Sequence, residues 1–474
     1  MSRPIEHLPP LVRSHAAYDT AALQAQDAAH FLHPFTDTKA LGAKGVRIMV
    51  RGEGVYIWDS EGKKILDGMS GLWNVSVGYG RKELCDAAYK QMFELPFYNS
   101  FFQTTNVPAV QLSTLLTEIS PKHFKHVFYT SSGSEGNDTV VRMVRRYWDL
   151  MGKPERQVII GRVNGYHGST MAGASLGGMA GMHAQGGLPI PNIAHIQQPY
   201  YFELGAGLTQ EEFGLKAASW LEDKILEIGA DKVGAFIGEP VQGAGGVIIP
   251  PMNYWPEIQR ICNKYDILLV SDEVICGFGR LGRWWGSEYH GVKPDLMTFA
   301  KGVTSGYIPL GGVMVGDRVA DVLIEKGGDF NHGFTYSGHP VACAVAIENI
   351  NIIRREKLVE KVDSDTGPYL REKFTQLADH PLVGIAETRG LMAGLVLVKN
   401  KNKKPIETFA PDLEVGMICR GYCFANGVIM RAVGDRMIIA PPLVITRGQI
   451  DELISLIKHC LDLTWEEVKK RKLV

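Results

Sequence analysis

The sequence lacks the features that direct a chain to membranes or nucleic acid. No apolar run reaches the ~18 residues of a membrane-spanning helix. The first residues, MSRPIEHLPPLVRSHAAYDT, contain no apolar signal core, so we expect a cytoplasmic protein. The formal net charge is −1, which gives no electrostatic reason to bind nucleic acid or an anionic membrane.

Cysteine is sparse, and its spacing argues against two kinds of site. No two cysteines have C-x-x-C spacing, and their number is odd, so we expect neither a zinc site nor a disulfide framework. We expect the thiols to be reduced and no metal to be bound. The seven cysteines are Cys85, Cys262, Cys276, Cys343, Cys419, Cys423 and Cys460.

The chain also lacks repeats and low-complexity stretches, and its middle alternates two kinds of pattern. Short apolar runs are predicted to be strands at 126–130, 157–161, 233–240, 267–274 and 295–302. Helical patterns occupy 135–150, 211–229 and 254–266. Near-continuous apolar strands separated by helices are typical of a mainly parallel sheet covered on both faces, so the fold class is α/β.

The two ends of the chain have a different pattern, and 474 residues are enough for two or three domains. Near the N-terminus, residues 47–68 predict two strands joined by a turn at 60–62, which we expect to pack with the C-terminal part. Towards the C-terminus, helices are expected at 341–355, 368–378 and 448–468, around a strand at 390–398. We predict an N-terminal segment (1–75), a large domain (76–338) and a small domain (339–474).

Ligands of parallel α/β sheets bind beyond the carboxyl ends of the strands. After the strand at 126–130 come Ser132, Gly133 and Ser134, followed by a helix. Small residues at a helix N-terminus, with free N–H groups and a positive dipole end, are suited to a phosphate. The plainer interpretation is a helix start capped by a serine.

Three further residues follow strands of the same predicted sheet. Tyr166 comes shortly after 157–161 and could stack on a ring, although a loop tyrosine is often a surface residue. Asp272 and Lys301 lie at the ends of the predicted strands 267–274 and 295–302, where a charge is costly unless it is paired. Desolvation would make the lysine a better nucleophile and base, whereas the alternative is a structural ion pair.

Together these features match the needs of one cofactor. Pyridoxal 5'-phosphate (PLP) requires a phosphate holder, a ring sandwich, a carboxylate at the pyridine nitrogen and a lysine for covalent attachment. The sequence therefore predicts a PLP enzyme in which Lys301 carries the cofactor.

Long motifs along nearly the whole chain resemble the class III (subgroup II) aminotransferases, and among them the ω-transaminases. The resemblance is nearest to the putrescine or polyamine:pyruvate and β-alanine:pyruvate groups. It implies PLP-dependent fold type I, with a seven-stranded, mainly parallel sheet and a smaller α+β domain. The motifs are GEGVYIWDSEGKKILDG, LPFYNSFF, TSSGSEGNDT, GYHGST, GEPVQGAGGVI, SDEVICGFGR, AKGVTSGYIPLGG and HGFTYSGHP.

The resemblance also implies the reaction and the assembly. An amino group would pass from a primary amine, a putrescine-like diamine or an ω-amino acid to pyruvate, giving L-alanine and an aldehyde or ketone. The chain would form a homodimer or homotetramer with shared active sites. The natural donor among these candidates and the enantiopreference stay open at this point.

The resemblance assigns roles to individual residues. Lys301 would hold the cofactor covalently, Asp272 would keep the pyridine nitrogen protonated, and Arg431 would pair with a substrate carboxylate. The other cofactor-binding residues would be Ser132, Gly133, Ser134, Tyr166, His167, Glu239 and Val274, with Thr335 reaching the phosphate from the partner subunit. The remaining pocket residues would be Phe35, Trp73, Phe101 and Ala244. Relatives more often carry Ala, Cys and Ala where this chain has Ser70, Asn74 and Gly136.

A nicotinamide-dependent dehydrogenase is the rival enzyme, because residues 277–282 match G-x-G-x-x-G and Asp295 follows. Residues 272–276, however, separate these glycines from the apolar strand, and RWWGSEYHG does not open a helix in the required way. The sequence also leaves room for a PLP aminomutase and for a binding protein without enzymatic activity.

Overall fold

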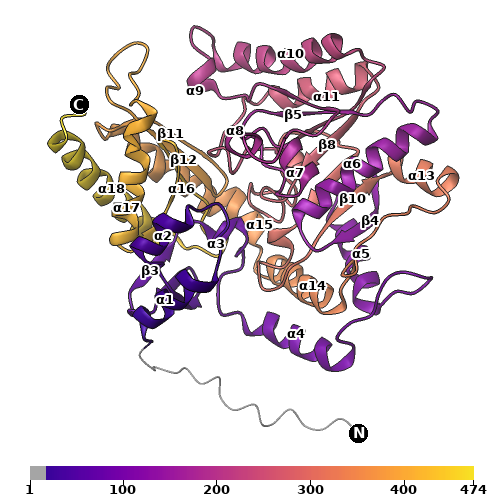
Figure 1. Cartoon of the computed structure of the whole chain (residues 1–474), viewed down its shortest axis with the longest axis horizontal. Coiled ribbons are helices and arrows are strands. Elements are labelled where there is room, and N and C mark those ends of the chain that lie inside the picture. The colour runs from indigo at the N-terminus through magenta and orange to yellow at the C-terminus, as the bar shows by residue number, and fades with distance from the viewer. Residues whose placement is uncertain (1–17) are drawn as a thin grey trace.

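A computed structural model describes residues 18–474, and a seven-stranded sheet lies at its centre (Figure 1). Strand β10 is antiparallel to both of its neighbours, and the other pairs are parallel. The predicted fold class is thereby confirmed. In spatial order the strands are β4 (Phe124–Thr130), β10 (Gly311–Gly316), β9 (Leu296–Phe299), β8 (Leu268–Asp272), β7 (Val233–Gly238), β5 (Val158–Arg162) and β6 (Ile193–Ile196).

Helices cover both faces of this sheet because its central strands are apolar on both sides. On one face, Ile237 of β7 packs in a core with α6 (Gly133–Leu150) and α13 (Asp317–Lys326). Its neighbour Phe236 points to the opposite face and packs with α10 (Gln210–Ile228) and α11 (Tyr254–Lys264). Successive side chains of a strand alternate between faces, so each buried strand serves two cores.

Two predicted strands end earlier than the sequence pattern indicated. Strand β8 ends at Asp272 and β9 ends at Phe299, whereas 267–274 and 295–302 were expected. Lys301 instead begins a short 3₁₀ turn, η1 (Lys301–Val303), with φ of 44°. The chain leaves the sheet at these points, so the polar side chains lie above its edge rather than within it.

The C-terminal part contains a second sheet, in the order β11 (Val383–Arg389), β12 (Met392–Leu397), β15 (Arg436–Ile439) and β14 (Arg431–Val433). The predicted helices there are α14 (Pro340–Arg355), α16 (Gly367–Thr375) and α18 (Arg447–Lys470). Helix α14 packs against α4 (Lys82–Glu94) and α5 (Val107–Glu118). The predicted division at 338–339 stays a prediction.

Segments from the two ends of the chain form a third sheet. Its order is β1 (Met49–Glu53), β2 (Tyr56–Asp59), β3 (Lys64–Asp67) and β13 (Val428–Ile429). The turn between β2 and β3 contains Gly62 with φ of 82°, and the Asp59 carboxylate accepts bonds from the N–H groups of Glu61 and Lys63. β3 pairs in parallel with β13, so the N-terminal hairpin lies beside residues about 360 positions later.

Shorter helices complete the described part of the chain. They are α1 (Thr20–His30), α2 (Thr38–Lys44), α3 (Ser70–Trp73), α7 (Met171–Leu176), α8 (Ala180–His183), α9 (Tyr201–Leu204), α12 (Gly286–Tyr289), α15 (Leu358–Lys361) and α17 (Val415–Ala425). Between residues 18 and 474, no helix has the length and apolarity needed to cross a membrane. Most of the N-terminal stretch in which the sequence shows no apolar signal core lies outside the described residues.

Candidate active site

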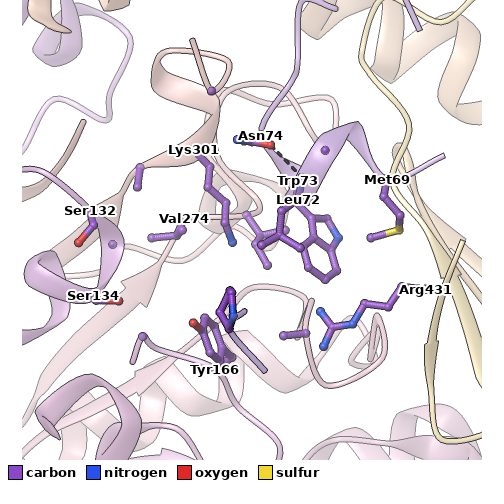
Figure 2. Close-up of a pocket in the computed structure, with 18 of the residues that line it drawn as sticks. Met69, Leu72, Trp73, Asn74, Ser132, Ser134, Tyr166, Val274, Lys301 and Arg431 are labelled. Atoms are coloured by element: carbon purple, nitrogen blue, oxygen red, sulfur yellow. Dashed lines mark hydrogen bonds between the residues drawn. The ribbon is translucent and has the colours of Figure 1, made fainter. Parts of the chain in front are cut away.

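A cavity of about 870 Å³ opens at the carboxyl edge of the central sheet. Its inner wall comes from the ends of β8 and β9 and the start of α6, and its outer wall from residues 69–74 and 429–432. Figure 2 shows Lys301, Trp73, Tyr166 and Arg431 pointing into this space. All the residues predicted for the site line the cavity except Phe101 and Thr335.

The predicted phosphate cup is the N-terminus of α6, an 18-residue helix. The Ser132 hydroxyl accepts a bond from the Glu135 N–H at 3.2 Å, so the capping interpretation is confirmed. The first N–H groups of any helix have no partner within the helix, which leaves donors for an anion. The backbones are packed closely here: a Cβ on Gly133 would lie 2.8 Å from Val274 and one on Gly168 would lie 2.6 Å from Ser134.

Asp272 is buried and fully engaged at the end of β8. Its Oδ2 accepts hydrogen bonds from Nδ1 of His167 at 2.7 Å and from Nδ2 of Asn137 at 2.8 Å. Its Oδ1 accepts from the N–H of Val274 at 3.1 Å. These three hydrogen bonds fix the orientation of the carboxylate at the edge of the cavity.

Lys301 is half-buried and lines the same cavity as that carboxylate. Burial lowers the pKa of Lys301 from its usual 10.5 to about 8, against the raising effect of the Asp272 and Glu239 carboxylates. Its Nζ lies 5.5 Å from the centroid of the Trp73 ring. A lysine with a pKa this low is neutral in a substantial fraction of molecules near pH 7–8, which a nucleophile or base requires.

Glu239 connects the floor of the cavity to the loop that carries Tyr166. Its carboxylate accepts bonds from the N–H groups of Tyr166 at 3.1 Å and Gly243 at 2.8 Å, and burial raises its pKa. Tyr166 and Val274 lie on opposite sides of the space beside Lys301 (Figure 2).

The outer half of the cavity is aromatic and carries a guanidinium. The Cζ of Arg431 lies 5.1 Å from the Trp73 ring centroid, and burial lowers the arginine's pKa. Phe35 lies at the mouth, 73% exposed, with its ring 6.3 Å from that of Tyr166. Ala244 completes the wall.

Phe101 and Thr335 lie outside this cavity of their own chain. Phe101 packs beside Gly333, where an added Cβ would lie 2.9 Å from its ring. Thr335 is exposed two residues further on. Their predicted contacts with substrate and with a partner's phosphate stay predictions.

The sequence analysis missed Asn137, although it lies in the TSSGSEGNDT motif. Asn137 is 1% exposed, and its Oδ1 accepts a bond from the Thr298 hydroxyl at 2.8 Å. A polar residue near the start of a helix covering an apolar sheet was the available signal. Arg420 and Phe424 of α17 also line the cavity, and nothing in the sequence placed them there.

Two of the three unusual positions lie beside Trp73. The Ser70 hydroxyl donates to the carbonyl of Ala440 at 2.6 Å and accepts from Arg280 at 3.3 Å. The Asn74 side chain accepts a bond from the Leu72 N–H at 3.0 Å and lines the cavity. Both therefore stabilise the bend that presents Trp73, which itself has a φ of 59°.

A model of one protein family, "Aminotransferase class-III", matches residues 41–461. The chain belongs to the class III aminotransferases. It is 60% identical to putrescine–pyruvate aminotransferase of Pseudomonas aeruginosa over 445 residues, which cover 94% of this chain and 97% of that protein. It is 42% identical to diaminobutyrate–2-oxoglutarate transaminase of Halomonas elongata, over 86% of this chain and 88% of that one.

Solved structures agree with this assignment. An (S)-enantioselective ω-transaminase from Thermomicrobium roseum has a TM-score of 0.91 at 43% identity, covering 94% of this chain and 99% of that one. An ω-transaminase from Pseudomonas jessenii, solved in complex with PMP, has a TM-score of 0.92 at 40% identity, with 94% and 99% covered.

This class III aminotransferase is therefore an enzyme, and the resemblance seen in its motifs is confirmed. The family is PLP-dependent. The dehydrogenase alternative was wrong: residues 277–282 form buried turns in which Arg280 donates to the carbonyl of Pro441. The short helix α12 begins only at Gly286, so no helix N-terminus meets these glycines.

Proposed function

We propose that this enzyme binds PLP in the described cavity and moves an amino group from a primary amine, a diamine such as putrescine, or an ω-amino acid to pyruvate. The products would be an aldehyde or ketone and L-alanine. The main support is Lys301, with its pKa of about 8, in one cavity with the hydrogen-bonded Asp272. The name of the P. aeruginosa relative supports the substrate pair.

The residues present fit the cofactor. The α6 N-terminus, with Ser132, Gly133 and Ser134, would hold the phosphate, and Tyr166 and Val274 would enclose the ring. Bound there, PLP would supply an electron sink for charge that develops on the substrate carbon. The P. jessenii neighbour was solved with PMP, which supports a related ligand here.

The chain's own residues would then manage protons and charge. Asp272, oriented by His167 and Asn137, would hold a proton on the ring nitrogen. Lys301 Nζ, in its neutral form, would remove the proton from the carbon that bears the amino group. The same nitrogen would return a proton when pyruvate receives the amino group.

The pocket would recognise pyruvate and the amine donor through different interactions. Arg431 would pair with the pyruvate carboxylate, since a guanidinium offers bidentate geometry in a pocket where an unpaired carboxylate is costly. A diamine has no carboxylate, so Arg431 would turn aside and leave the aromatic wall of Trp73 and Phe35 to its alkyl chain.

The enzyme would act as a homodimer or homotetramer. Large exposed aromatic side chains lie next to Thr335 or beside its near neighbours. Tyr336 is 58% exposed, with its ring 5.8 Å from that of Phe97. Phe102 is 90% exposed and contacts Phe101, which packs beside Gly333. Such side chains are unusual on the surface of a monomer and support a partner interface. Thr335 would reach the partner's phosphate across it. The cytoplasmic location stays a prediction from the sequence.

A donor panel with pyruvate tests the reaction, with alanine formation as the readout. Putrescine, longer diamines, β-alanine and a 1-aryl amine would be compared at equal concentration, and diamines should be among the fastest. Borohydride reduction and peptide mapping test the cofactor site independently, with an adduct expected on Lys301. No alanine from any donor would refute the proposed reaction, and an adduct on another lysine would refute the site.

A further inference from the structure

The backbone that carries Lys301 adopts an unusual conformation. Lys301 and Ser305 have φ of 44° and 50°, in the left-handed region that side chains disfavour. Backbone bonds within the turn are long: Thr304 N–H to Lys301 and Ser305 N–H to Gly302 both measure 3.4 Å. Strained backbone persists only where surrounding structure holds it.

One buried side chain from another element supplies that support. Asn349 of α14 is 0% exposed, and its Nδ2 donates to the carbonyls of Gly302 and Val303, each at 2.9 Å. Its Oδ1 accepts from the Ser305 hydroxyl at 2.6 Å. All the polar groups of the amide are thus directed at the four residues that follow Lys301.

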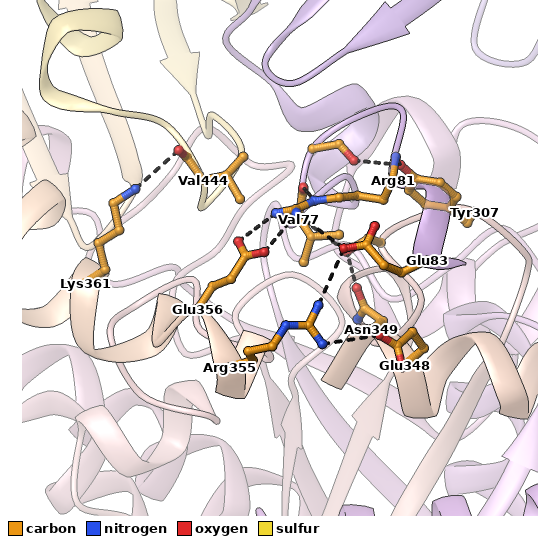
Figure 3. A network of polar contacts seen from close by, with 12 residues as sticks. Val77, Arg81, Glu83, Tyr307, Glu348, Asn349, Arg355, Glu356, Lys361 and Val444 are labelled. Carbon is orange, nitrogen blue, oxygen red and sulfur yellow. Dashed lines mark hydrogen bonds and ion pairs between the residues drawn. The ribbon is translucent and has the colours of Figure 1, made fainter. Parts of the chain in front are cut away.

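The turn is also attached to a segment outside α14. The Ser305 hydroxyl accepts a bond from the Val77 N–H at 3.2 Å, and the Tyr307 hydroxyl accepts from the Arg81 N–H at 2.8 Å. The Arg81 guanidinium forms a bidentate pair with Glu356, which directly follows α14. Figure 3 shows Glu356 paired with Arg81, and Asn349 on the same side of this segment.

We infer that Asn349 is a positioning residue: by holding the turn at Gly302, Val303 and Ser305, it fixes where Lys301 Nζ stands relative to Asp272 and to the substrate carbon. The inference rests on the proposed function. A misplaced catalytic group slows transfer even when substrate still binds, so the expected loss is in kcat rather than in KM.

Two variants remove the contact in different ways. Asn349→Asp keeps the shape and still accepts from Ser305, but a carboxylate cannot donate to two carbonyls. Asn349→Ala removes all three bonds. Trp148→Phe is the matched control, because it deletes a 2.9 Å bond to the buried carbonyl of Gly234 at the far end of α6.

Hydrogen exchange of the cofactor-free protein gives a readout that does not depend on turnover. In both Asn349 variants the amides of Val303, Thr304 and Ser305 should exchange at least about 10-fold faster, while in Trp148→Phe they should be unchanged. If the Asn349 variants do not fold, Ser305→Ala, which removes one of the three bonds, should still give faster exchange at these amides. Unchanged exchange in whichever of these variants folds would overturn the inference.

The effect on catalysis is measured on the enzyme with PLP bound. The Asn349 variants should shift the pH midpoint of the visible absorption by at least about 0.5 unit and lower kcat about 10- to 100-fold, with little change in KM for the amine. A wild-type pH midpoint and kcat in both variants would overturn the positioning role. Absence of any borohydride adduct on wild-type Lys301 would instead refute the proposed function, and the exchange data would still decide whether Asn349 holds the turn.

Discussion

At the scale of single residues, each charged side chain of the cavity lies beside groups that offset the cost of removing it from water. Burial lowers the pKa of Lys301, whereas the carboxylates of Asp272 and Glu239 raise it. The balance is a pKa of about 8. Asp272 in turn depends on His167 and Asn137. The pKa of Lys301 and the orientation of Asp272 therefore depend on the residues around them.

Lys301→Ala should abolish turnover but leave PLP bound. The α6 N-terminus and Asp272 would still hold the phosphate and the ring without the covalent link. Equilibrium dialysis with PLP, followed by absorption spectra, measures this. Loss of both binding and turnover would show that Lys301 supplies most of the cofactor affinity.

The lowered pKa of Lys301 predicts a pH-dependent stability in the cofactor-free protein. Folding moves the pKa from 10.5 to about 8, so between these pH values the unfolded chain binds more protons and stability rises with pH. Below pH 8 the buried charge costs at most about 3 kcal/mol. Lys301→Met should therefore be more stable than wild type at pH 7, with the advantage shrinking toward pH 10 in urea titrations. An advantage that is independent of pH would contradict the pKa.

Arg431→Ala should separate the two half-reactions. The loss of a charge-assisted pair costs roughly 1.5–4 kcal/mol, which corresponds to about 10- to 1000-fold slower reaction with pyruvate. A diamine makes no such pair, so its half-reaction should change little. Stopped-flow absorption follows each step separately, and equal slowing of both would mean that Arg431 supports the fold instead.

At the scale of elements, α6 packs closely on β9. This contact positions Asn137, which donates a hydrogen bond to Asp272. A Cβ on Gly136 of α6 would lie 2.7 Å from Cγ2 of Thr298, whose hydroxyl donates to Asn137. An alanine at this position would need a smaller neighbour than Thr298. The glycine and the threonine are thus a coupled pair.

Gly136→Ala should therefore push Thr298 away and disturb Asn137, lowering stability by about 1–3 kcal/mol and slowing turnover. Adding Thr298→Ser removes the methyl group but keeps the hydroxyl, so the double variant should recover most of both losses. Gly421→Ala in α17 is the control, because an added Cβ there meets nothing within 4 Å. Additive effects in the double variant would rule out the coupling.

At the scale of the whole molecule, the exposed aromatic side chains near Thr335 predict that assembly and cofactor retention are linked. Phe102→Asp places a charge on a residue that is 90% exposed in the single chain. It should shift sedimentation toward the monomer and speed the loss of PLP on dilution. Leu226→Asp, at a 61% exposed site on α10, should do neither. A fully active monomer with tightly bound PLP would refute the shared site.

The sequence by itself determined the fold class, the PLP motifs and the residues at strand ends, because these follow from local apolar patterns and short contiguous segments. It placed Asp272 and Lys301 correctly at one sheet edge, since parallel strands bring their carboxyl ends together. It placed the ends of β8 and β9 too late, because apolar pattern alone does not show where a chain leaves a sheet.

Only the tertiary structure decided which distant residues support these groups. Asn349 holds the Lys301 turn from a helix 48 residues later, and Arg431 stacks on Trp73 across more than 350 positions. Such pairs have no local sequence signal, because each residue is compatible with many neighbours until the helices and sheets pack. The strained turn at Lys301 exists for the same reason: its backbone conformation is stable only when buried partners from α14 satisfy it.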